Sequence, residues 1–122
     1  MPGKKVLIID DDAKNIFALS ATLKAKGYEN LSATSAAEGI QLLKTDNGIG
    51  IVLMDMMMPG MDGYEALQEV KRLEDLRVPV IAVTAQAMKG DRERCLQAGA
   101  DDYISKPINV DLLLNVLQRF LS

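Results

Sequence analysis

The chain has 122 residues, a formal net charge of −3, 48% hydrophobic residues and 25% charged residues. This length predicts one domain, residues 1–122, with a sizeable core. The slightly negative net charge argues against binding to nucleic acid or to an anionic membrane surface, both of which need a basic surface. The N-terminal apolar run is too short for a signal peptide or a membrane span. The lone cysteine, Cys95, excludes an internal disulfide, so we expect a packing residue in a reducing compartment, the cytoplasm.

The first half of the chain predicts two strand–helix units. Residues 6–9 form a continuous branched apolar run, typical of a strand covered on both faces, and they end at an Asp triplet. The last member of that triplet, Asp12, suits the N-cap of a helix that stops at Gly27. A weak strand over residues 31–34 leads to a capping box that opens a second helix at Ser35.

The second half predicts three further units. Residues 51–55 form an apolar strand that ends on an acid, and a loop rich in Met, Pro and Gly separates it from a third helix. Residues 78–84 form the fourth strand, and a helix over residues 87–98 follows it. A fifth strand at residues 102–105 leads to a last helix over residues 110–121.

The alternation of five strands with five helices predicts the fold class. Strand–helix–strand units join parallel strands through right-handed crossovers. Because the strands are nearly all apolar, helices should cover both faces of the sheet. We therefore expect an α/β fold, a flavodoxin-like, doubly wound (βα)5 three-layer sandwich with a parallel sheet in the order 2-1-3-4-5.

Polar residues follow four of the five predicted strands, and in such a sheet they meet beyond the carboxyl ends. They are Asp10, Asp11, Asp55, Thr84 and Lys106. Each has an ordinary role when taken alone, as a helix cap, a strand-end hydroxyl or a surface lysine. Three clustered carboxylates, however, repel one another unless a cation neutralises them, and oxygen ligands suit Mg²⁺. With Lys106 as a positive charge and Thr84 as a hydrogen-bond donor, the set indicates phosphate chemistry.

These motifs resemble the CheY-like receiver domains of two-component response regulators, over essentially the whole chain. The resemblance lies in Leu-Ile-Ile-Asp-Asp-Asp at 7–12, Leu-Met-Asp at 53–55 with Met-Pro-Gly-Met-Asp-Gly at 58–63, Val-Thr-Ala at 83–85, and Ala-Gly-Ala-Asp-Asp-Tyr-Ile-Ser-Lys-Pro at 98–107. The segment 87–93 is further similar to receivers attached to hybrid histidine kinases.

The resemblance implies Asp55 as the phosphoacceptor beside a magnesium site. Asp11 and Asp55 would bind Mg²⁺ directly, Asp10 through water, and Met57 through its backbone carbonyl. Lys106 would contact the phosphoryl group. The protein would then be a signalling receiver rather than an enzyme in the ordinary sense, catalysing only its own Mg²⁺-dependent phosphorylation and dephosphorylation.

The resemblance also implies a switch and a set of partners. Thr84 would contact the phosphoryl group and move inward, Tyr103 would fill the space that Thr84 vacates, and the Lys106–Pro107 bond would be cis. The phosphodonor would be a histidine kinase or a histidine phosphotransfer protein. A downstream effector would read the surface formed by the fourth helix, the fifth strand and the last helix.

Two hydrophobic features of the sequence leave alternatives open. In the last helix we expect Val110, Leu113, Leu117 and Phe120 to face the sheet. Leu112, and with it Val116, would then face solvent or a partner, such as a second copy in a weak homodimer. The methionines around Asp55 suit either a soft docking patch or a division between core and pocket rim, and we favour the division.

Three other functions remain to be weighed. A flavin carrier shares the fold, but the Asp triplet would repel a flavin phosphate unless a metal intervened. A phosphatase with an aspartyl nucleophile would, by its family pattern, want a second acid two residues after Asp55, where Met57 stands. A receiver that has lost phosphorylation is disfavoured because all five pocket residues are present.

Overall fold

Five parallel strands form the middle layer of the structure, in the order β2-β1-β3-β4-β5. The computed structural model describes residues 4–46, 48–58, 63–72, 78–84 and 91–121, except the side chains of residues 91 and 92. Within them the strands are β1 (Lys5–Ile9), β2 (Asn30–Ala33), β3 (Ile49–Asp55), β4 (Val80–Thr84) and β5 (Asp102–Ser105). The helices are α1 (Ala13–Ala25), α2 (Ala36–Thr45), α3 (Gly63–Lys71), α4 (Asp91–Gln97) and α5 (Val110–Leu121). The predicted doubly wound fold and strand order are confirmed.

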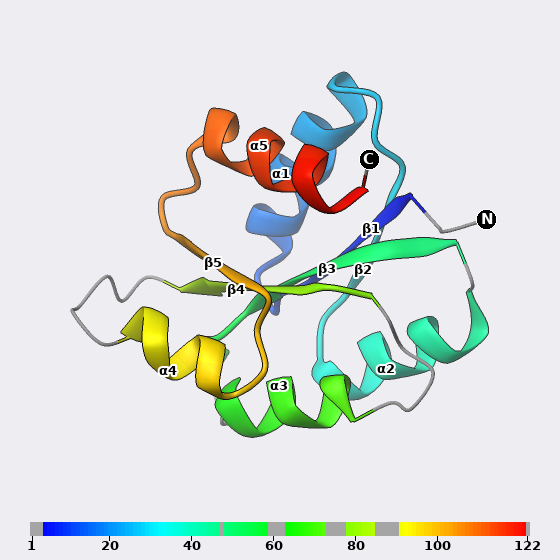
Figure 1. Ribbon diagram of the computed structural model, residues 1–122. Coiled ribbons are helices and arrows are strands. Elements are labelled where there is room, and N and C mark those ends of the chain that lie inside the picture. The colour runs from blue at the N-terminus through cyan, green and yellow to red at the C-terminus, as the bar shows by residue number, and fades with distance from the viewer. Residues whose placement is uncertain (1–3, 47, 59–62, 73–77, 85–90, 122) are drawn as a thin grey trace.

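Helices cover both faces of the sheet. Figure 1 shows α1 and α5 on one face and α2, α3 and α4 on the other. Alternate residues of β1 enter the two cores, Val6 and Ile8 with α1 and α5, and Leu7 and Ile9 with the opposite helices. Cys95 of α4 is buried among apolar side chains, so its expected packing role is confirmed. No helix among the described residues is long and apolar enough to cross a membrane.

Local sequence signals set the helix boundaries. The side chain of Asp12 caps α1 and that of Ser35 caps α2, each by accepting a backbone N–H bond, as predicted. Gly27 and Gly99 follow α1 and α4 with φ of +88° and +116°, a conformation that favours glycine. The predicted start of the fourth helix, at residue 87, lies outside the described residues.

The last helix corrects two predictions. Leu113 and Leu117 are buried and Leu112 is exposed, as expected, but Val116 is only 8% exposed and Val110 is 39% exposed. The buried stripe thus runs through Leu113, Val116 and Leu117, and the half-buried Phe120 continues it. Side chains lean toward the N-terminus of their helix, so Val110, the first residue, projects beyond the packed interface.

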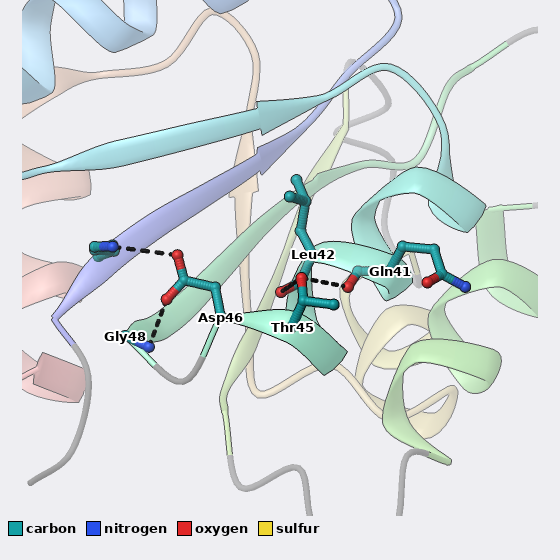
Figure 2. A network of polar contacts seen from close by, with 6 residues as sticks. Gln41, Leu42, Thr45, Asp46 and Gly48 are labelled. Atoms are coloured by element: carbon teal, nitrogen blue, oxygen red, sulfur yellow. Dashed lines mark hydrogen bonds and ion pairs between the residues drawn. The ribbon is translucent and has the colours of Figure 1, made fainter.

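Asp46 joins α2 to the edge of the sheet where the strands begin. Its Oδ1 accepts the Gly48 N–H at 2.7 Å, and its Oδ2 lies 3.1 Å from Nζ of Lys5 (Figure 2). The Lys5 N–H in turn donates to the Gly48 carbonyl at 2.9 Å. The Gly48 bond first, and then Lys5, lower the pKa of Asp46 below its ordinary value. This acid stabilises the connection between α2 and β3.

We expect Gly63→Ala to destabilise the fold. A Cβ at Gly63 would lie 2.6 Å from the backbone oxygen of Met56, which cannot yield as a side chain can. The expected loss is about 1–3 kcal/mol in the free energy of unfolding, measured by urea denaturation.

Gly39→Ala is the matched control. Its Cβ would meet the flexible end of Ile9 at 2.5 Å, and the higher helix propensity of alanine, about 1 kcal/mol, offsets part of the repacking. Equal or greater destabilisation by Gly39→Ala would contradict the assignment of the rigid contact to Gly63.

Candidate functional site

The register of the two central strands places Asp10 beside Asp55. Ile9 of β1 pairs with Met54 of β3, and each acid comes one residue later. Ile8 and Leu53 belong to the core under α1 and α5. Because alternate strand residues share a face, Asp10 and Asp55 point to that same side. The two acids therefore meet at the carboxyl edge of the sheet, where β1 and β3 lie next to each other.

The predicted acidic cluster is present. One carboxylate oxygen from each of Asp10, Asp11 and Asp55 lies within 4.8 Å of the others. Asp10 and Asp55 are 6% and 5% exposed, whereas Asp11 is exposed. Three oxygens at this spacing, two of them held by buried residues, form a donor set that can hold a hard divalent cation.

Lys106 lies against the two buried acids. Its Nζ is 3.2 Å from Oδ2 of Asp55 and 3.9 Å from Oδ2 of Asp10. The Lys106 backbone N–H donates to the Thr84 carbonyl at 2.8 Å, which ties the end of β5 to that of β4. The Lys106–Pro107 peptide bond is cis, as expected. One cation therefore offsets part of the charge of three carboxylates.

Burial changes the acidity of one of these acids. Burial first, and then the charge of Asp55, raise the pKa of Asp10 above its ordinary value of 3.8. The Asp12 backbone N–H and Lys106 act in the opposite direction. Folding therefore makes Asp10 a weaker acid than a free carboxyl, mainly because the group is buried.

The two predicted switch residues share one face of the sheet. Thr84 pairs with Ser105, and Tyr103 pairs with Ala82 two residues earlier, so Thr84 and Tyr103 project on the same side. Thr84 is 4% exposed, and Tyr103 packs against the core under α2, α3 and α4. Thr84 ends the strand beside that of Asp55, and Tyr103 lies one strand further out, on β5.

The methionines divide between core and rim, as favoured. Met54, Met56 and Met58 are buried, whereas Met57 is exposed beside Asp55. Met61 lies outside the described residues.

Sequence reasoning missed two backbone donors at the site. The Asp12 N–H donates to Oδ1 of Asp10, and the Met57 N–H donates to Oδ1 of Asp55, both at 2.9 Å. Each bond joins an acid to the N–H two residues later, the pattern of an Asx turn, which the strand-ending acids could have signalled. These bonds fix one oxygen of each buried acid and leave the other toward Lys106.

Comparisons with known proteins agree with this geometry. The family model for the response regulator receiver domain matches residues 6–118. The polar-differentiation response regulator DivK of Brucella ovis is 39% identical over 119 residues, which cover 97% of this chain and 96% of that protein.

Two solved structures are also similar. One is the receiver domain of sensor histidine kinase PA1611 from Pseudomonas aeruginosa, solved with magnesium in its active-site cleft. It has a TM-score of 0.85 and 36% identity, and the match covers 98% of each chain. The other is the receiver domain of Ssk1 from Saccharomyces cerevisiae, solved with the histidine phosphotransfer protein Ypd1. Its TM-score is 0.83 at 25% identity, covering 98% of this chain and 89% of that one. From the match to the family model and the similarity to DivK, we conclude that the chain belongs to the response regulator receiver domain family.

Proposed function

We propose that Asp55 is the phosphoacceptor of this receiver domain. The observation that carries the proposal is a buried carboxylate at the end of a central strand, 3.2 Å from Lys106 and clustered with two other acids. In the transfer, an oxygen of Asp55 forms a bond to phosphorus while the phosphorus–nitrogen bond of a phosphohistidine breaks, and the imidazole nitrogen keeps the electron pair. The chain thus catalyses its own phosphorylation, chiefly by positioning and charge.

The residues around Asp55 fit Mg²⁺. Carboxylate oxygens of Asp10, Asp11 and Asp55 would hold it, Asp10 through water, and the Met57 carbonyl would complete the protein's share. Bound there, Mg²⁺ would offset the negative charge of the transferring phosphoryl group and promote hydrolysis of the acyl phosphate. The raised pKa of Asp10 fits such a site, because burial and the charge of Asp55 oppose its ionisation and a bound cation would favour it.

Lys106 and Thr84 would act on the phosphoryl oxygens. The Lys106 ammonium, now near the Asp55 oxygen, needs only a small shift to pair with a phosphoryl oxygen. The Thr84 hydroxyl would donate a hydrogen bond to another. Because Thr84 and Tyr103 lie on one face of neighbouring strands, an inward movement of Thr84 would leave space for Tyr103.

This movement would change the surface of α4, β5 and α5, where we place the effector. On this surface Tyr103 and the exposed Leu112 line a groove, and we place weak self-association there.

The similarity to Ssk1, solved with Ypd1, supports a histidine phosphotransfer protein or histidine kinase as the phosphodonor. Near-complete coverage of DivK supports residues 1–122 as one domain. The sequence has one cysteine, Cys95, and so no internal disulfide, which suits a reducing compartment, the cytoplasm.

Asp55→Asn should abolish phosphorylation. Acetyl phosphate with Mg²⁺ should add one phosphoryl group to the wild-type protein, detected by intact-mass spectrometry. The amide of the variant is not a nucleophile at this step and should take up none. Asp12→Asn is the control, because it removes a nearby exposed acid and keeps a capping acceptor for α1. Undiminished labelling of Asp55→Asn would exclude Asp55 as the acceptor.

Asp11→Ala should weaken Mg²⁺ binding by about tenfold or more, because it removes one of few protein ligands. NMR shift titration with Mg²⁺ measures the affinity, again with Asp12→Asn as the control. Wild-type affinity in Asp11→Ala would refute the pocket.

In the presence of a metal chelator, Asp10→Asn and Asp46→Asn should change the free energy of unfolding at neutral pH in opposite directions. The raised pKa of Asp10 contributes stability below its ordinary value of 3.8, and this contribution is lost as pH rises through the raised pKa. Asp10→Asn should therefore increase the free energy of unfolding at neutral pH and lose that advantage in acid. The lowered pKa of Asp46 contributes stability above 3.8 that is lost as pH falls.

Asp46→Asn should accordingly destabilise the protein at neutral pH and have little effect in acid. Urea denaturation at the two pH values tests both variants. Changes of the same sign at neutral pH would contradict the opposite environments of the two acids.

A further inference from the structure

A groove of about 560 Å³ lies between α1 and the start of α5, with the sheet as its floor. One wall consists of Asn15, Ala18, Leu19 and Thr22, which share a face of α1. Leu53 contributes to the floor. Pro107, Ile108, Val110 and Leu113 form the opposite wall. The volume is that of a small-molecule site, and phosphoryl transfer uses only one end of it.

The groove is elongated and has one charged end. Asn15 to Thr22 spans seven residues of α1, a rise of about 10 Å. Asp10, Asp55 and Lys106 line the groove where the strands end. The rest of the lining is predominantly apolar, with Thr22 toward the far end.

The charged end favours a cation. Two carboxylates of the lining face one ammonium, and Asp11 lies within 4.8 Å of both acids. Lys106 is already engaged, 3.2 Å from Asp55 and 3.9 Å from Asp10. An anionic ligand head would be repelled by the excess negative charge of the three acids, whereas an ammonium would offset it.

We propose that this groove binds a small organic monocation, a primary amine on an apolar body about 10 Å long. The ammonium sits at Asp10 and Asp55, and the apolar body lies along Ala18, Leu19 and Leu53. Binding buries apolar surface of both partners, and the charge pair fixes the orientation.

Such a ligand occupies the carboxylates that Mg²⁺ would use and covers the approach to Asp55. It therefore competes with Mg²⁺ and inhibits phosphorylation. This consequence rests on the proposed function, whereas binding of the amine to the unphosphorylated, metal-free protein does not.

The test is an NMR titration of the metal-free protein with octylamine, and with octanoate and octanol as charge controls. Ala18→Phe should fill the groove, and Ala21→Phe is its matched control, since Ala21 is also an exposed residue of α1 but does not line the groove. We expect octylamine to bind the wild-type protein and Ala21→Phe alike, and Ala18→Phe about tenfold more weakly. Mg²⁺ should raise the apparent dissociation constant of octylamine.

Three results would overturn the proposal. They are no saturable octylamine binding, equal binding of octanoate or octanol, and equal effects of the two phenylalanine variants. Labelling with acetyl phosphate in the presence of octylamine then tests the consequence separately. If octylamine binds saturably but does not inhibit labelling, the groove is an amine site that does not compete with phosphorylation. If the protein binds octylamine but cannot be phosphorylated at all, only the proposed function is refuted.

Discussion

The mutual repulsion of three carboxylates is the constraint around which this structure is arranged. Asp10, Asp11 and Asp55 are held within 4.8 Å because β1 and β3 are neighbours in the sheet and their register ends the two strands at the same level. Both strands are buried on two faces, so core packing holds the acids together against their repulsion. Lys106 offsets part of the charge, and the remainder makes the site receptive to a cation.

Asp46, where the strands begin, and Asp10, where they end, show how the surroundings of an aspartate decide its effect on stability. Asp46 has a backbone donor and Lys5 close by, so its ionised form stabilises the fold. Asp10 has a backbone donor too, but burial and Asp55 outweigh it, and its pKa is raised. A protein gains stability from the first arrangement, and it keeps the second, at a cost in stability, where function needs it.

The sequence predicts the features that depend on period and chain order, and it misses those that depend on three-dimensional packing. Strand order follows from apolar runs alternating with helices, and the caps at Asp12 and Ser35 follow from local chemistry. The burial of Val116 was missed because spacing alone does not decide which of two adjacent stripes meets the sheet. The Lys5–Asp46 ion pair and the groove between α1 and α5 join residues far apart in the chain, which no local pattern records.

The central claim is that the phosphoryl group resides on Asp55 as an acyl phosphate. Reduction of the phosphorylated protein with borohydride converts the modified aspartate to homoserine, which peptide mass spectrometry locates by sequence. The account predicts homoserine at position 55 alone, formed only after phosphorylation. Homoserine at position 10 or 11, or none in a protein that carries phosphate, would contradict it.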